Sequence, residues 1–108
     1  MFFHEEENGT VAVLLAYEDE HPGETLTMSF AEGDEYRCVF LTAYEDDNDE
    51  DESDPSYDEF HTVVYDIVEE LSPGPNATDG DSRTLCLNYR HMPVKVTADD
   101  GTVVYEKG

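Results

Sequence analysis

Apolar and polar residues alternate along several segments of this chain, which is the pattern of a β-strand with one buried face. In residues 25–30 the apolar positions are Leu26, Met28 and Phe30, so we expect these side chains to point into a core. Residues 36–44 are apolar almost throughout and predict a second, well-buried strand. With their neighbours, these segments predict an antiparallel meander of three or four strands.

Turn signals predict a hairpin near each end of the chain. The Asn-Gly pair at residues 8–9 is a strong signal for a two-residue hairpin turn, and apolar segments flank it at 2–4 and 10–17. A second turn, at 99–101, separates two strand-like segments near the C-terminus. The C-terminal part therefore supplies three further predicted strands, at 84–89, 94–97 and 102–105.

In residues 57–71 the spacing of apolar positions changes to one typical of a helix. The apolar positions on that helical face are Phe60, Val63, Val64, Ile67, Val68 and Leu71. Ser56 would cap the helix, with Glu59 three residues later completing a capping box. The β-branched residues of this stripe suit a strand as well. We predict one helix near 57–71, packed on the sheet and ended by the prolines that follow.

These segments together predict an α+β domain of about six or seven antiparallel strands, arranged as a meander with hairpins, and one helix. The 108 residues fit a single domain, 1–108. We expect an acidic loop at 46–55 and a loop rich in proline, glycine and polar residues at 72–83. Cys38 and Cys86 lie within apolar segments, and we expect both to be buried free thiols.

Charge changes this picture more than any other property. The chain holds 28 acidic and five basic residues, for a formal net charge of −23 at pH 7. Such a chain is repelled by phosphate backbones and by anionic lipids, so we expect no direct binding to nucleic acid or membrane. No apolar run approaches the ~20 residues of a membrane span, and the start of the chain lacks the features of a signal peptide, so we expect a cytoplasmic protein.

The acidic residues are concentrated in the first two thirds of the chain. Residues 1–70 contain 23 acidic residues and one basic residue, whereas residues 71–108 contain five and four. The densest run, 45–59, has ten carboxylates in fifteen positions. Uniform acidity, typical of adaptation to concentrated salt, would not produce this asymmetry, which indicates a function for the acid in the first part.

No pattern for catalysis or for a cofactor is present. The sequence has no nucleophile elbow, no phosphate-binding glycine loop and no Cys/His ligand spacing, so we expect neither an enzyme nor a bound cofactor. Asp46, Asn48 and Glu50 alternate as at the start of a calcium loop. Asp51 and Tyr57 stand where that loop requires glycine and glutamate, so we expect no metal site.

The charge pattern therefore carries the functional hypothesis. Proteins that bind DNA hold its phosphates with lysine and arginine, and carboxylates spaced about 6 Å apart on a strand or helix can occupy the same basic sites. We predict a nucleic-acid-mimicking inhibitor of the anti-CRISPR, anti-restriction or nuclease and glycosylase inhibitor type, whose acidic face fills the basic groove of its target. The predicted face consists of Tyr57, which can stack on arginine, and the carboxylates Glu45, Asp46, Asp47, Asp49, Glu50, Asp51, Glu52, Asp54, Asp58, Glu59, Asp66, Glu69 and Glu70.

Two other interpretations of the sequence remain open. In one, the chain is an interaction module that does not mimic nucleic acid, such as an immunity protein or an accessory subunit. In the other, the acid keeps a domain without a specific acidic-face partner hydrated in concentrated salt. The pattern predicts no particular oligomeric state.

Overall fold

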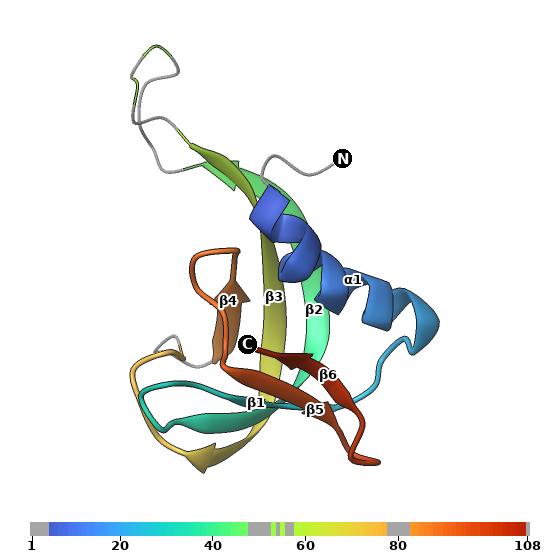
Figure 1. Ribbon diagram of the computed structural model, residues 1–108. Coiled ribbons are helices and arrows are strands. Elements are labelled where there is room, and N and C mark those ends of the chain that lie inside the picture. The colour runs from blue at the N-terminus through green and yellow to red at the C-terminus, as the bar shows by residue number, and fades with distance from the viewer. Residues whose placement is uncertain (1–4, 48–52, 54, 56–57, 78–82, 108) are drawn as a thin grey trace.

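The computed structural model describes residues 5–47, 53, 55, 58–77 and 83–107, with the backbone alone for residues 46 and 47. These residues form a six-stranded antiparallel sheet in the order β4-β3-β2-β1-β5-β6, with an α-helix packed against it (Figure 1). The elements are the 3₁₀ helix η1 (Glu5–Gly9), α1 (Val11–Glu20), β1 (Leu26–Ser29), β2 (Glu35–Asp47), β3 (Glu59–Ser72), β4 (Thr84–Leu87), β5 (Lys95–Ala98) and β6 (Val103–Glu106). The predicted α+β class is confirmed, and the number of strands is close to the prediction.

Strands β1 to β4 form a meander, and β5 pairs with the free side of β1. Of the segments predicted to form a meander, only 25–30 and 36–44 belong to it, as β1 and β2. Leu26, Met28 and Phe30 are all buried, as expected from their period of two. The predicted C-terminal hairpin is also present, as β5 and β6. Its turn places Gly101 at a φ of 92°, a conformation that glycine adopts without steric cost.

The sheet curls around its core. The core cluster contains side chains of α1 and of the five strands β1 to β5, including the fully buried Tyr36 and Tyr65. Helix α1 contacts both β3 and β6, which are far apart in the strand order. Burial of these apolar side chains from water is the main source of stability for such a fold.

The prediction of a helix at 57–71 is wrong, because most of this segment is the long strand β3. Four successive residues, 62–65, are buried, so both faces of the strand are covered there. Apolar residues on both faces of a strand fall by chance at helical spacings, and the β-branched content belonged to the strand. Ser56, the predicted cap of the helix, lies outside the described residues.

The prediction of a hairpin around residues 8–9 is also wrong. Residues 5–9 form η1, and the apolar run that follows is α1. This run contains alanine and leucine, which favour helix, and it does not alternate with polar residues. Val11 and Leu14, three apart, are the side chains that it buries completely. The strand predicted at 2–4 lies outside the described residues.

Two predictions about loops and thiols need correction. Cys38 is a buried free thiol, as expected, but Cys86 is exposed because strand alternation turns its neighbours Leu85 and Leu87 into the core instead. The acidic loop begins later than residue 46, because β2 continues to Asp47. The second predicted loop likewise begins after residue 72, the last residue of β3, and residues 78–82 lie outside the described part.

The described part of the second loop is tied to a buried carboxylate. Asp34, only 1% exposed, accepts hydrogen bonds from the Tyr36 hydroxyl (2.8 Å) and from the backbone N–H (3.1 Å) and side-chain amide of Asn76. Burial by itself would raise the pKa of Asp34, but these hydrogen bonds to the charged form outweigh it and lower the pKa below 3.8. Gly74 packs so closely on Asp34 that a side chain at this position would collide with it.

Candidate functional site

The β2–β3 hairpin extends beyond the rest of the sheet (Figure 1). The two strands are 13 and 14 residues long, whereas β4 pairs only with residues 63–66 of β3. The chain between Asp47 and Asp58, which contains most of the densest acidic run, joins the two strands at this projecting end. The strand pairing therefore places the described ends of that run, Glu45–Asp47 and Asp58–Glu59, at one extremity of the sheet.

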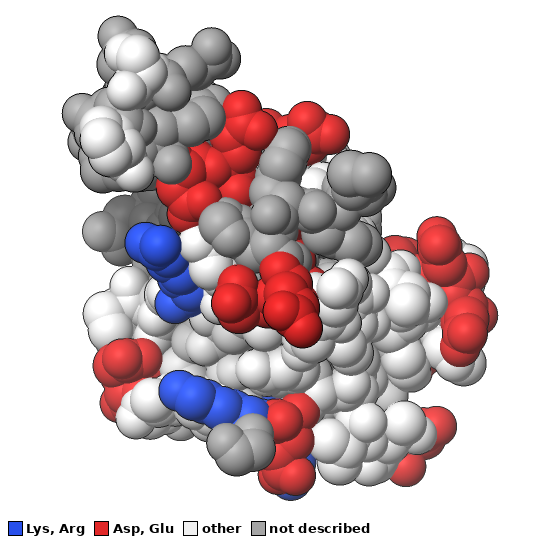
Figure 2. Space-filling view, turned by 45° about the horizontal axis from the view of Figure 1, so that its top comes forward, with Lys and Arg blue, Asp and Glu red and all other residues white. Residues whose placement is uncertain are grey.

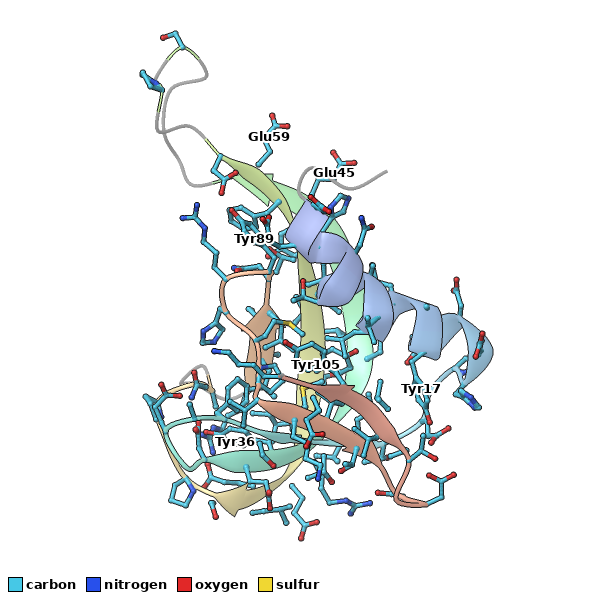
Figure 3. The ribbon with its side chains drawn as sticks, viewed as in Figure 1. Tyr17, Tyr36, Glu45, Glu59, Tyr89 and Tyr105 are labelled. Atoms are coloured by element: carbon cyan, nitrogen blue, oxygen red, sulfur yellow. The ribbon has the colours of Figure 1, made fainter. Side chains whose placement is uncertain are left out.

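Carboxylates on the strands themselves lie at the same end. Glu45 of β2 is opposite His61 of β3, and Asp47 is opposite Glu59. Glu45 and Glu59 both lie at the hairpin end in Figure 3, away from the core. A β-bulge contributes to this geometry. Because of the register shift at Leu41, Ala43 faces the core, and Glu45, two residues later, lies on the same face of β2. The core does not extend as far as Glu45, so this side chain is exposed.

The N-terminal 3₁₀ helix adds two more carboxylates to this end. Glu7 is fully buried, and its Oε2 accepts a hydrogen bond from the backbone N–H of His61 (2.7 Å) and lies 3.1 Å from His61 Nδ1. Because β4 does not reach His61, this side chain satisfies an N–H group that no strand pairs. The contact holds η1 on the hairpin and brings the exposed Glu5 and Glu6 to the end that carries Glu45.

We call Glu5, Glu6, Glu45 and Glu59 the acidic end of the hairpin. Figure 2 shows carboxylates gathered there, apart from those at the end of α1. Within the described part of the chain, Glu5, Glu6 and Glu45 form no ion pair. Like charges held close together repel one another, which lowers the stability of the folded protein.

Asp58, at the start of β3, has a different role from its neighbours. Its Oδ2 accepts a hydrogen bond from the Tyr89 hydroxyl (2.6 Å) and lies 3.6 Å from the guanidinium of Arg90. Burial, together with this hydrogen bond, raises the pKa of Tyr89. The Arg90 guanidinium also lies 5.3 Å from the centre of the Tyr89 ring. Asp58 therefore ties the hairpin to the turn after β4 and is only partly available to a partner.

The predicted residues farther along β3 do not join the acidic end. Glu69 forms an ion pair with Arg37 (3.2 Å), and Glu70 pairs with Arg83, both at the opposite end of the hairpin. Asp66 lies between the two ends, opposite Val39. The continuous acidic line expected along a helix is therefore absent, because β3 spreads these residues along an extended strand and cations neutralise two of them.

Part of the predicted face lies outside the described residues. The structure describes the backbone but not the side chains of Asp46 and Asp47, and it does not describe the remaining members Asp49, Glu50, Asp51, Glu52, Asp54 and Tyr57. The sequence prediction missed Glu5 and Glu6. The run Glu5-Glu6-Glu7 is a visible acidic signal, but only the contact between Glu7 and His61 shows which surface it joins.

No family model, curated protein or solved structure matches this chain. Across residues 5–47, 58–77 and 83–107, no group of three or more His, Cys, Asp or Glu side chains is arranged to hold a metal ion. No helix in this part of the chain has both the length and the apolar character needed to cross a membrane. Fold and site together define an α+β domain with a projecting acidic hairpin.

Proposed function

We propose that this protein is a nucleic-acid-mimicking inhibitor, and that the acidic end of its hairpin occupies the basic groove of a nucleic-acid-binding enzyme. The observation that carries the proposal is the contrast between the two ends of one hairpin. At one end Glu69 and Glu70 are paired with arginines, whereas at the projecting end Glu5, Glu6 and Glu45 lie together without an ion pair in the described part. The protein acts by binding rather than by catalysis.

The geometry of the hairpin suits this role. Residues two apart on one face of a strand are separated by about 6.6 Å, and directly opposed residues on paired strands have Cβ atoms about 5 Å apart. Glu45, Asp47 and Glu59 occupy such positions. A ladder of this kind offers successive anionic groups to the lysines and arginines of a groove built for phosphates. Because the hairpin projects, it can enter such a groove while the body of the domain stays outside.

The targets that fit are enzymes with a basic channel for DNA or RNA, such as restriction enzymes, CRISPR effectors, glycosylases and toxin nucleases. Such targets act on nucleic acid inside the cell, so we place the inhibitor in the cytoplasm. Its partner is a basic protein, and neither nucleic acid nor membrane binds it directly, since its net charge of −23 opposes both.

The proposal is tested by capture and competitive elution. The immobilised protein is exposed to a lysate of a nuclease-rich bacterium at ~0.1 M salt, and bound proteins are eluted with duplex DNA or with RNA. We expect release of a nucleic-acid enzyme, and retention that weakens steeply as salt rises. Proteins that remain bound in the presence of excess nucleic acid would contradict mimicry.

Two variants with the same change in charge locate the contact. Glu45→Gln combined with Glu59→Gln removes two carboxylates from the acidic end, and Glu69→Gln combined with Glu70→Gln removes two from the opposite end of the same strands. We expect the first pair to lose retention of the enzyme and the second pair to keep it. Equal losses would mean that net charge alone attracts the partner.

A second candidate function is an interaction module that does not mimic nucleic acid. Five large apolar side chains are exposed on the described surface. Four of them belong to the β2–β3 hairpin: Leu41, Tyr44, Val68 and Leu71. Exposed apolar patches often mark protein interfaces. This alternative predicts a partner that nucleic acid does not displace and whose binding depends little on salt.

A further inference from the structure

A groove of about 320 Å³ separates α1 from β6. Its walls are formed mainly by Val13, Ala16, Tyr17 and Glu20 of the helix and by Val103 and Val104 of the strand. The walls are largely apolar, with Glu20 as the charged side chain among them. This groove lies on the helix side of the domain, and Tyr17 marks it in Figure 3, well apart from Glu45 and Glu59.

The apolar walls belong to a helix that has more apolar surface than the core uses. All residues of α1 from Val11 to Tyr17 are apolar or aromatic, so every side of the helix carries such residues. The core completely buries Val11 and Leu14, whereas Ala16 is exposed and Val13 only half-buried. A helix that is apolar on all sides is normally covered on all sides.

The opposite wall of the groove, formed by β6, also exposes apolar surface. Val103 of β6 is 48% exposed, although it lines the groove and β-branched residues are favoured in strands that are covered. No described residue closes the groove above it. The groove therefore presents apolar surface from two elements to whatever lies outside.

The charges near the groove indicate what kind of ligand it could bind. Glu18, Asp19 and Glu20 form the last turn of α1, and no basic residue is present in that turn. Three carboxylates at the negative end of a helix dipole are unfavourable there, and a cation at this end would be favourable. Glu18 partly offsets this by accepting the N–H of Gly23 (2.8 Å).

Further acid surrounds Tyr17. Its hydroxyl donates a hydrogen bond to Glu24 (2.7 Å), and this bond, burial and the charges of Glu24 and Asp100 raise the pKa of Tyr17 to about 12. His21 lies here as well: it stacks on the Tyr17 ring and has its Nδ1 3.5 Å from Glu24. Arg37 pairs with Asp99 (2.9 Å), next to Asp100 in the turn before β6. Anionic groups from α1, the turn after it and the turn before β6 thus converge on one side of the groove.

We propose that this groove binds a basic segment of a partner polypeptide, with a large apolar side chain between α1 and β6 and an adjacent arginine or lysine on Glu20. A second copy of the chain does not fit this role, since it carries the same net charge of −23. The site goes beyond the proposed function. It lies on a different surface from the acidic end and is tested with a different ligand, so either proposal can fail alone.

The probe is a capped pentapeptide with arginine, leucine and arginine at its centre. It is titrated to ~1 mM into the ¹⁵N-labelled full chain, and amide shifts are followed by NMR. Two control peptides replace both arginines by neutral citrulline or the leucine by serine. We expect saturable shifts at residues 13–20 and 102–104 with the first peptide, and weaker binding of both controls.

Matched variants separate a site from general charge attraction. Glu20→Gln removes the carboxylate that lines the groove, and Asp19→Asn removes its exposed neighbour, which does not line it. We expect Glu20→Gln to weaken peptide binding about two- to fivefold and Asp19→Asn to leave it within about twofold. Ala16→Phe, at an exposed helix position that tolerates a side chain, should fill the groove and abolish the shifts.

Three results would overturn the proposal. These are no saturable shift at ~1 mM, shifts centred on the acidic end instead of the groove, or equal losses from Glu20→Gln and Asp19→Asn. Each of these leaves the inhibition of a nucleic-acid enzyme by the hairpin untouched, because that is measured with other variants.

Discussion

Replacing Glu7 by alanine should destabilise the fold more than replacing any other carboxylate near the hairpin end. Glu7 is fully buried, and its Oε2 serves both the backbone N–H and the ring of His61. A hydrogen bond to a charged acceptor contributes about 1.5–3 kcal/mol, and leaving the N–H of this partly buried contact without its acceptor costs about 1–2 kcal/mol more. Together these two contributions give a loss of about 3–5 kcal/mol.

For a chain of this size, that loss lowers the melting temperature by roughly 10–20 °C. The assay is thermal unfolding followed by circular dichroism at pH 7, with urea unfolding as a second measure. Glu6→Ala is the matched control, because Glu6 is the exposed neighbour of Glu7 in the same helix and its loss should change stability by less than about 0.5 kcal/mol. If Glu7→Ala melts at the temperature of Glu6→Ala, the contact does not hold η1 on the hairpin.

Three further predictions concern the packing described above. Gly74→Ala should destabilise the fold by about 1–3 kcal/mol, because the new Cβ would lie 2.3 Å from the Cβ of Asp34, whereas Gly9→Ala meets nothing within 4 Å; equal unfolding midpoints would contradict this. Asp34→Asn should be less stable than the unaltered protein at pH 7. Because the pKa of Asp34 is lower in the folded state than in the unfolded state, its carboxylate stabilises the fold above about pH 4, and this contribution disappears in acid, so the difference between the two proteins should shrink there. Urea unfolding midpoints between pH 2 and 7 test this. A thiol reagent should modify the exposed Cys86 in the native protein but Cys38 only after unfolding, because burial raises the pKa of Cys38 to about 12; mass spectrometry distinguishes the two.

The sequence predicted best those strands that have one buried and one open face. In β1 the alternation of Leu26, Met28 and Phe30 matches their burial, and β5 alternates in the same way. The C-terminal hairpin was predicted from its turn, which ends in Gly101. The pattern failed where burial is not one-sided. β3 is covered on both faces at residues 62–65, and α1 is apolar on all sides, so neither shows the period of its own structure.

The candidate site could be predicted only in part, for a related reason. The local pattern placed the acidic run after a predicted strand, but it predicted a helix behind the run, so only the pairing of β2 with β3 brings Glu45 and Glu59 to the same end. The arrival of Glu5 and Glu6 depends on a contact between residues 54 positions apart in the chain. The pairing of Glu69 with Arg37 depends on strand register. Local sequence contains neither kind of information.

The most direct test of the proposed mimicry is a competition titration with the enzyme captured from the lysate. The affinity of that enzyme for its own nucleic acid is measured against rising concentrations of this protein, at several salt concentrations. The account predicts mutually exclusive binding, and a shallower salt dependence of inhibitor binding for Glu45→Gln with Glu59→Gln than for Glu69→Gln with Glu70→Gln. A ternary complex of enzyme, nucleic acid and inhibitor, or identical salt dependence for the two double variants, would contradict the claim that the acidic end stands in for nucleic acid.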